Sequence, residues 1–276
     1  MRIVVCSMNN IGRYAIEELA RKTPVVGLFT VKERGKLYMD PTDYTALAAM
    51  LQIPLFKNQD INAPDVAAQM RALKPDFCMC IGWKQIIKKH LLEIPKYGWI
   101  GGHPAKLLFP GEKVAADTLS APGNEPLNYA IRGGYKKTGM TLFWLKEKID
   151  NGELFARGEI ELDAHETSAT LLEKMGRLTA KLVLDNMAAL LAGRPPRIPQ
   201  QHQEEQPYMQ PLKADENRID LSRPADETDA LIRSEYYPYP RAFIDFYGKR
   251  IYIDHARFEN GVCTELKVRT AGTPWG

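Results

Sequence analysis

The sequence predicts an α/β protein, a Rossmann-like, doubly wound, mostly parallel sheet followed by a small C-terminal domain of mixed or β-rich structure. Near the N-terminus, a β-branched run (residues 2–7), an amphipathic segment (11–22) and a second apolar run (24–30) have the spacing of a βαβ unit. Residues 76–83, DFCMCIGW, are apolar on both faces, as a central parallel strand requires. Residues 241–258 alternate like a hairpin, which predicts β-structure near the C-terminus.

The same periodicity extends the first domain. Residues 41–52 and 65–74 are predicted to be helices, and residues 96–104 a strand that ends at His103. Residues 106–125 contain two Pro-Gly pairs and predict a long surface loop with at most one helical turn. Loops of this length inside compact domains are often functional.

A short helix and a hairpin follow the long loop. Residues 126–139 begin as a helix and then contain two consecutive glycines. Residues 140–149 and 153–162 are strand-like, and Asp150-Asn151-Gly152 joins them. Asn and Gly tolerate positive φ, so this join also has an ordinary explanation as a hairpin corner.

A long helix is expected to close the first domain. Apolar residues between positions 167 and 191 fall on one helical stripe. Thr170 and Glu173 form a capping box if the helix begins there.

The chain is therefore divided into three parts. Residues 1–193 form the first domain, residues 194–206 a linker rich in proline and glutamine, and residues 207–276 the small C-terminal domain. Within this last part, residues 222–235 are predicted to be a capped helix, and the hairpin turns around Gly248.

Composition excludes several classes of function. The formal charge of +3 arises from 37 basic and 34 acidic residues mixed along the chain, without the basic patch that nucleic-acid binding needs. No apolar run approaches a signal peptide or the roughly 18 residues of a membrane span. We therefore expect a cytoplasmic protein that binds neither nucleic acid nor membrane.

Neither a metal nor a nicotinamide cofactor is expected. Cys78 and Cys80 are separated by one residue, whereas zinc sites usually begin with two to four, so buried reduced thiols are the preferred interpretation. The loop after the first strand carries only Gly12, not the three spaced glycines of a dinucleotide site.

His103 and Asp150 are the candidates for acid-base chemistry. His103 directly follows a strand, and ligands of parallel sheets bind at the carboxyl ends of the strands. A carboxylate near an imidazole orients the ring and stabilises its protonated form, which proton transfer needs. Taken alone, His103 also has a structural interpretation as part of a turn.

Five segments in order resemble the folate-dependent formyltransferase family, which includes methionyl-tRNA formyltransferases, sugar-nucleotide N-formyltransferases and the hydrolase domain of 10-formyltetrahydrofolate dehydrogenase. The similarity covers nearly the whole chain and implies the formyltransferase fold and a transferase of one-carbon groups. The segments are residues 74–89, 101–104 (GGHP), 124–145, 149–155 (IDNGELF) and 219–243.

The resemblance implies roles for individual residues. His103 takes a proton from the acceptor amine or hydrogen-bonds the forming oxyanion, and Asp150 fixes the imidazole and helps to pass the proton on. Trp83 and Trp144 lend themselves equally to roles as core aromatics. The residues implied to bind 10-formyltetrahydrofolate, the formyl donor, are Trp83, Gln85, Ile86, Ile87, Leu145, Glu147 and Ile149.

The chain departs from the family at two places. Gly101 stands where the family has an asparagine that holds the formyl oxygen, so a backbone N–H of Gly101 or Gly102, or a water, is expected to take over. The hydrolase domain of the dehydrogenase also lacks this asparagine. The long loop after His103 replaces a shorter family loop beside the acceptor, which indicates an unusual acceptor or none.

The leading function is N-formyl transfer to a small-molecule amine, and a nucleotide-linked amino sugar is the favoured acceptor. One alternative is a 10-formyltetrahydrofolate hydrolase. The other is an inactive homologue that binds folate or a partner protein, since Gly101 replaces the asparagine. The resemblance also allows a homodimer.

Overall fold

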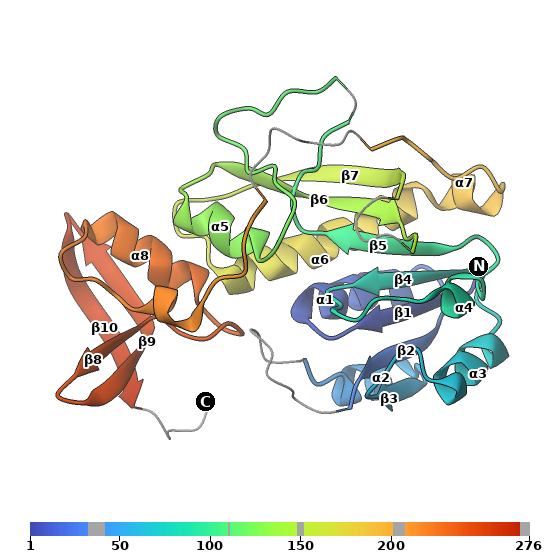
Figure 1. The fold of residues 1–276 in the computed structure, drawn as a ribbon, viewed down its shortest axis with the longest axis horizontal. Helices are drawn as coiled ribbons and strands as arrows, with labels where there is room; N and C mark the ends of the chain where they lie inside the picture. The colour runs from blue at the N-terminus through green and yellow to red at the C-terminus, as the bar shows by residue number, and fades with distance from the viewer. Residues whose placement is uncertain (33–41, 110, 148–151, 201–207, 271–276) are drawn as a thin grey trace.

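A computed structural model of the chain describes residues 1–32, 42–109, 111–147, 152–200 and 208–270, and it confirms the α/β class with a doubly wound sheet (Figure 1). Seven strands form the main sheet in the order β3-β2-β1-β4-β5-β6-β7. The first five strands in chain order pair in parallel, and the last two pair antiparallel. The strands are β1 (Ile3–Ser7), β2 (Val25–Val31), β3 (Leu55–Asn58), β4 (Phe77–Ile81), β5 (Trp99–His103), β6 (Lys137–Trp144) and β7 (Leu154–Glu161).

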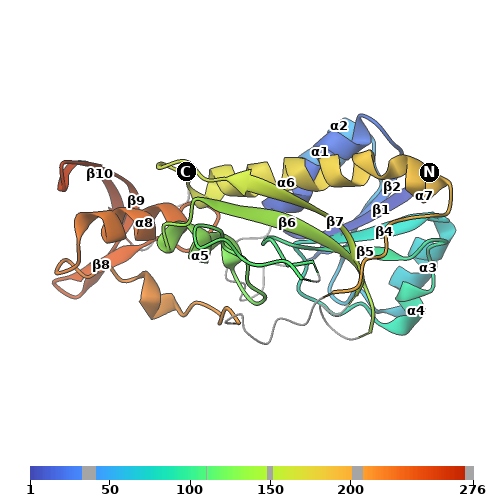
Figure 2. The same ribbon diagram turned by 90° about the horizontal axis from the view of Figure 1, so that it is seen from above.

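Helices cover both faces of this sheet, as Figure 2 shows. In β1 the side chains alternate, so Ile3 and Val5 join the apolar cluster under α1, α2 and α6, whereas Val4 and Cys6 join the one under α3 and α4. Both faces of the central strands are therefore buried. The helices of this part are α1 (Asn10–Ala20), α2 (Thr45–Leu51), α3 (Pro64–Ala72), α4 (Lys89–Leu92), α5 (Pro126–Arg132), α6 (Ser168–Asp185) and α7 (Met187–Leu191).

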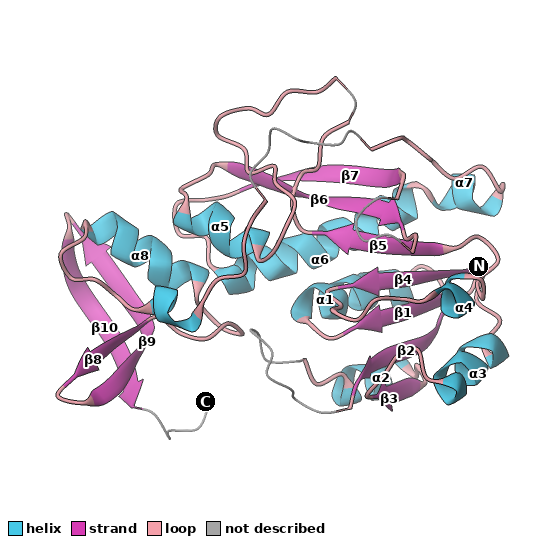
Figure 3. Cartoon of the chain, in the orientation of Figure 1, coloured by secondary structure: helices cyan, strands magenta, loops and turns pink. Residues whose placement is uncertain are grey.

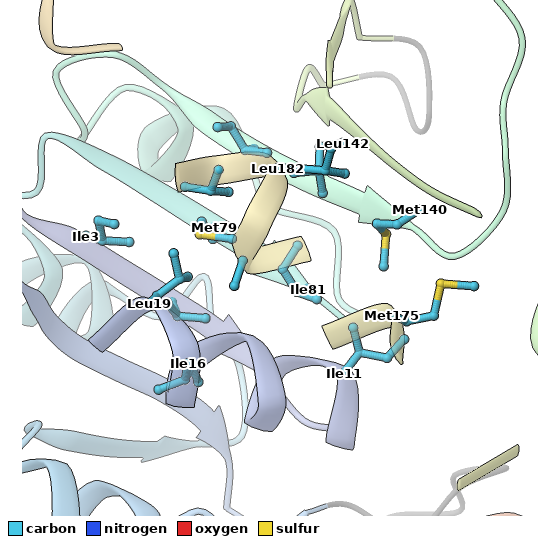
Figure 4. Packing of buried hydrophobic residues seen from close by; sticks show 14 of the residues in the cluster. Ile3, Ile11, Ile16, Leu19, Met79, Ile81, Met140, Leu142, Met175 and Leu182 are labelled. Carbon is cyan, nitrogen blue, oxygen red and sulfur yellow. The ribbon is translucent and has the colours of Figure 1, made fainter. Parts of the chain in front are cut away.

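The larger apolar cluster joins residues that are far apart in the sequence. Ile11 of α1, Ile81 of β4, Met140 of β6 and Met175 of α6 are all buried in it (Figure 4). This packing lies beneath the carboxyl ends of β1 and β4, so it supports the edge of the sheet where a ligand of a parallel sheet would bind.

The long predicted helix divides into α6 and α7 at Asn186, so the prediction of one helix over residues 167–191 is wrong in this detail. The Asn186 side chain donates to the Leu182 carbonyl oxygen at 2.9 Å, and such local bonding competes with the helix. The capping box joins Thr167 to Thr170 rather than Thr170 to Glu173. Neither α6 nor any other helix among the described residues is long and apolar enough to cross a membrane.

A three-stranded antiparallel sheet follows, in the order β10-β9-β8, and packs against α8, which in turn packs against α5 (Figures 1 and 3). Tyr247 and Gly248 both have positive φ at the β8–β9 turn, which confirms the predicted hairpin. The helix α8 has no side-chain cap, contrary to expectation, because Pro224 occupies its N-cap. The elements are 3-10 helix η1 (Ala214–Asn217), α8 (Ala225–Ser234), β8 (Phe243–Phe246), β9 (Lys249–Glu259) and β10 (Val262–Thr270).

Four elements lie where the sequence patterns predicted none, namely β3, α4, η1 and β10. The strand β10 is exposed along most of its length, so it lacks the apolar alternation that marks a half-buried strand. The division into residues 1–193, 194–206 and 207–276 stays a prediction, and residues 201–207 lie outside the described residues.

Gly176 allows α1 and α6 to approach closely. A Cβ at this position would lie 2.6 Å from the Ile11 carbonyl oxygen and 2.5 Å from Tyr14 Cβ. Because one of these atoms belongs to the backbone, the helices would have to separate to make room.

We therefore expect Gly176→Ala to lower the free energy of unfolding, although alanine favours helix over glycine by about 1 kcal/mol. Overpacking of a well-filled contact costs about 1–3 kcal/mol, which exceeds that gain. Urea unfolding followed by circular dichroism measures the difference. Lys181→Ala, on the exposed side of the same helix, should change stability by less than about 0.5 kcal/mol. A stabilised Gly176→Ala variant would contradict the close packing.

Candidate active site

A cavity of about 270 Å³ opens where the strand order reverses, between the carboxyl ends of β1 and β4. Its wall also includes the end of β5, the end of the long loop and the start of α5. One residue, Tyr239, comes from the C-terminal part of the chain. The described lining residues are Met8, Asn9, Ile11, Cys80, Ile81, Gly82, Trp83, Lys84, Gly102, His103, Pro104, Gly123, Asn124, Glu125, Pro126, Leu127, Met140 and Tyr239.

The two loops that form the floor of this cavity contact each other at Gly82. Gly82 has φ +58°, and a Cβ there would lie 2.0 Å from the Asn9 side chain. Asn9 is the N-cap of α1 and accepts from the Gly12 N–H at 3.4 Å. The absence of a side chain at Gly82 thus lets the loop after β4 lie against the cap of α1.

A second cavity, of about 180 Å³, adjoins the first. Its wall includes seven residues that the sequence analysis assigned to the site: Trp83, Gln85, Ile86, Ile87, Gly101, Leu145 and Glu147. The two cavities share Cys80, Trp83, Lys84 and Gly102. Ile149 and Asp150 lie outside the described residues, so their predicted roles stay predictions.

The Gln85 side chain fixes the loop after β4. Its Oε1 accepts from the Ile61 N–H at 2.8 Å, and its Nε2 donates to the Gln59 carbonyl oxygen at 2.6 Å. Both ends of the amide are therefore engaged with backbone, and the side chain positions the loop. The Ile87 backbone forms no hydrogen bond with any other described residue, so its N–H and C=O remain available to a ligand.

The two tryptophans predicted to be either site or core residues have different surroundings. Trp144 donates from Nε1 to the Pro196 carbonyl oxygen at 2.8 Å and packs in the larger apolar cluster, so it is a core residue. Trp83 lines both cavities, and its buried Nε1–H has no hydrogen-bond partner among the described residues.

Gly101 lies inside β5, opposite Cys80 of β4 and Phe143 of β6. A residue inside a central strand directs its N–H and C=O toward the neighbouring strands, which argues against the predicted role of this N–H as an oxyanion donor. A Cβ at Gly101 would lie 2.4 Å from Leu145 Cδ2, so Leu145 fills the space of a side chain at this position. Gly102 lines both cavities.

The His103 imidazole is buried, with 7% of the residue exposed, and its Nε2 lies 2.9 Å from the Ala121 carbonyl oxygen. A carbonyl oxygen only accepts hydrogen bonds, so Nε2 carries the hydrogen of this contact. In the neutral form of His103, Nδ1 is therefore the nitrogen that carries no hydrogen.

The loop that supplies this carbonyl is anchored at both ends, and part of it is buried rather than on the surface as predicted. At its start, Thr141 Oγ1 donates to the Ala105 carbonyl oxygen at 2.7 Å and accepts from the Leu107 N–H at 2.9 Å. At its end, the Leu119 N–H donates to the Lys137 carbonyl oxygen at 2.8 Å. The buried loop residues are Leu107, Leu108, Thr118, Leu119, Ser120 and Ala121.

An ion pair fixes the middle of the loop. Arg157 of β7 donates to both carboxylate oxygens of Glu112 and to the Leu107 carbonyl oxygen, and its guanidinium lies 4.0 Å from the Phe109 ring centroid. Burial alone would raise the pKa of Glu112, but the hydrogen bonds from Arg157 and the Phe109 N–H, together with the charges of Arg157 and Lys106, lower that pKa.

Glu125 is a lining residue that the sequence analysis did not identify. It has φ +50°, a conformation that costs a non-glycine residue roughly 1–2 kcal/mol. Its Oε2 accepts from the Leu212 N–H at 3.0 Å. Periodicity gave no signal for it, because backbone strain and long-range burial are visible only in the folded chain.

A buried polar network brings Tyr239 to the cavity. Arg132 of α5 pairs with Glu235 at the end of α8 at 2.6 Å, and Asn128 and Asn217 donate to the same carboxylate at 2.9 and 3.0 Å. Burial raises the pKa of Glu235, while Arg132 opposes this change. The network joins α5 to the segment of chain that carries Tyr239, four residues after Glu235.

Within the described parts of the chain, no three His, Cys, Asp or Glu side chains lie close enough together to hold a metal ion. The four cysteines are unpaired by disulfides, and burial raises the pKa of the Cys80 thiol to about 12. The polar groups of the two cavity walls include the His103 imidazole, side-chain amides, backbone groups, and the carboxylates and ammonium groups of Glu125, Glu147, Lys84 and Lys146.

Comparison with known proteins places this geometry in context. A family model described as "Formyl transferase" matches residues 2–187. The methionyl-tRNA formyltransferase of Methylacidiphilum infernorum (isolate V4) is 30% identical over 250 residues, which cover 88% of this chain and 73% of that protein. The methionyl-tRNA formyltransferase of Bacillus velezensis is 29% identical over 230 residues, covering 82% and 68%.

Solved structures share the fold. A methionyl-tRNA formyltransferase from Clostridium thermocellum superimposes with a TM-score of 0.66 at 20% identity, covering 98% of each chain. HypX from Aquifex aeolicus in complex with tetrahydrofolic acid gives 0.66 at 17% identity, covering 95% of this chain and 40% of that one. A 4-N formyltransferase from Francisella tularensis gives 0.65 at 17% identity, covering 96% and 98%.

The polar network predicts a pH-dependent loss of stability in Arg132→Met. The Glu235 carboxylate then stays buried without its counter-ion, which costs about 3–5 kcal/mol. Its folded-state pKa rises further above the unfolded value, so the folded state binds more protons, and stability falls as pH rises between these two pKa values. Urea unfolding should show a larger loss at about pH 8 than at about pH 5.

The matched control is Arg223→Met, which removes an exposed pair with Glu227. This change should cost less than about 1 kcal/mol at either pH. An equal loss of unfolding free energy in both variants would contradict the argument that the buried Arg132–Glu235 pair matters more for stability than the exposed pair.

Proposed function

Because this chain belongs to the formyl transferase family of one-carbon transferases, we propose that it moves a formyl group from 10-formyltetrahydrofolate to the nitrogen of an amine. The observation that carries the proposal is that two adjacent cavities share part of their walls. His103 lines one of them, the residues assigned to the folate donor line the other, and four residues belong to both.

The second cavity suits the folate donor. Its wall combines apolar side chains, including Ile87 and Leu145, with the unpaired backbone groups of Ile87. A flat heterocycle with donors and acceptors at its edge matches this combination. In the proposal, Ile87 and its neighbours hold the pterin, while Trp83 lies between the donor and the acceptor.

The transfer makes one bond and breaks one. The donor supplies the formyl carbon, which gains a bond to the amine nitrogen and loses its bond to folate N10, and one proton passes net from the amine to N10. His103 takes that proton at Nδ1, since Nε2 is held by Ala121. The hydrogen bond to Ala121 keeps the ring oriented during this step, and Asp150 stays the predicted carboxylate partner.

For the acceptor we propose a nucleotide-linked amino sugar. The cavity beside His103 is small, and the chain carries nearly equal numbers of basic and acidic residues. Recognition of a tRNA relies on a basic surface, which this composition does not favour. Methionyl-tRNA is the second candidate, since relatives 29% and 30% identical to this chain are named methionyl-tRNA formyltransferases.

The test supplies purified protein with 10-formyltetrahydrofolate and follows the release of tetrahydrofolate. Acceleration by an amino-sugar nucleotide supports the proposed acceptor, and acceleration by methionyl-tRNA supports the second candidate. Release without any acceptor indicates a hydrolase instead. Binding of tetrahydrofolate without release indicates an inactive folate-binding homologue, and no binding in calorimetry rejects the proposed donor.

We expect His103→Ala to reduce turnover at least about 100-fold, because the proton acceptor is lost. Tetrahydrofolate should still bind with nearly unchanged affinity, since His103 lies outside the wall of the donor cavity. His255→Ala, in the exposed part of the C-terminal sheet, is the control and should retain activity. Full activity in His103→Ala would remove the catalytic assignment.

A further inference from the structure

We propose that Glu125 binds the ammonium group of the acceptor, so that the acceptor is a primary amine recognised in its protonated form. Before the attack the bound ammonium releases one proton to water, which frees the nitrogen lone pair, and the second proton passes to N10 as in the proposed function. This inference rests on the proposed function and adds to it a residue that determines specificity. Glu125 lies in the same cavity wall as His103.

The first argument is charge. Glu125 is the one carboxylate among the described residues that line the His103 cavity. It forms no ion pair with Lys84 or with any other cation that the structure describes. A half-buried carboxylate without a counter-ion favours the arrival of a cationic ligand.

The second argument is the arrangement of its two oxygens. Oε2 accepts from the Leu212 N–H at 3.0 Å, and Oε1 accepts no hydrogen bond from a described residue. The backbone is fixed as well, because the Asn128 N–H donates to the Glu125 carbonyl oxygen at 3.0 Å. One oxygen therefore anchors the side chain, and the other remains available to a ligand.

The third argument is the state of the carboxyl group. Burial raises the pKa of Glu125, and the Leu212 hydrogen bond and the nearby Lys84 charge oppose this rise only in part. Because the carboxyl group is partly shielded from water, a bound ammonium group strongly stabilises its ionised form. Glu125 is the N-cap residue of α5, and this position places it in the cavity wall.

The test compares two small nucleophiles of similar size, ethylammonium, which is protonated at neutral pH, and methoxyamine, which is not. Loss of the formyl group from 10-formyltetrahydrofolate is measured against the concentration of each probe for the wild type and Glu125→Gln. Glutamine keeps the size of the side chain and an acceptor for Leu212. We expect the KM for ethylammonium to rise about 10- to 100-fold, the size of one lost charge-assisted hydrogen bond.

The other parameters should change little. The kcat with ethylammonium, the KM for methoxyamine and the dissociation constant of tetrahydrofolate from calorimetry should each stay within about twofold, since Glu125 is argued to bind charge only. Glu227→Gln is the matched control, because Glu227 is an exposed carboxylate outside both cavity walls. It should leave the KM for both probes unchanged.

Several outcomes overturn the inference. An equal rise in KM for both probes gives Glu125 a merely structural role, and an unchanged KM for ethylammonium gives it no role in binding. A wild type that binds tetrahydrofolate but shows no amine-dependent loss of the formyl group also rejects it, while the folate part of the proposed function survives. Failure to bind tetrahydrofolate rejects the proposed function itself.

Discussion

The hydrogen bond between His103 Nε2 and the Ala121 carbonyl oxygen joins the two structures on which the candidate site depends. His103 is carried by the sheet, at the end of β5, and its position follows from strand pairing. Ala121 belongs to a long connection whose position depends on anchors to β6 and β7. Because Nε2 donates its hydrogen to this carbonyl oxygen, it cannot accept a proton. The position of the loop therefore leaves Nδ1 as the ring nitrogen that could act as a base.

The C-terminal part of the chain contributes to the same cavity by a different physical means. The Arg132–Glu235 pair is buried, and a buried ion pair adds little net stability relative to apolar residues of the same size. The pair instead favours one geometry of the junction, because Asn128 and Asn217 also donate hydrogen bonds to the Glu235 carboxylate. A fixed junction at this point keeps Tyr239 in the cavity wall.

Sequence patterns predicted the main sheet well, because its central strands are buried on both faces and its helices have strong apolar stripes. Residues 76–83 and the helix around Ile16 are examples in which local pattern and final burial agree. The short β3 and the exposed β10 were missed, since neither has a pattern that differs from a loop. The split at Asn186 depends on a single side-chain hydrogen bond, which periodicity averages out.

The residues of the candidate site also fall into a group that the sequence predicted and a group that it missed. Residues on continuous segments, such as Trp83 and Ile87 after β4, were predicted by resemblance, and both line the second cavity. Glu125 and Lys84 were missed as lining residues, because their contribution depends on which loop lies opposite them in space. Gln85 lines the cavity too, but its amide is engaged by the backbone of residues 59 and 61, a contact that no local pattern reveals.

Leu145 offers a physical account of the glycine at position 101. Its side chain fills the space in which a Cβ at residue 101 would lie, so the wall of the donor cavity is continuous without an amide there. An asparagine restored at position 101 would have to displace Leu145, a flexible side chain, as well as press on Phe143 at 3.2 Å. Residues 101 and 145 therefore form one packing unit, and a polar side chain at position 101 requires Leu145 either to move or to be replaced as well.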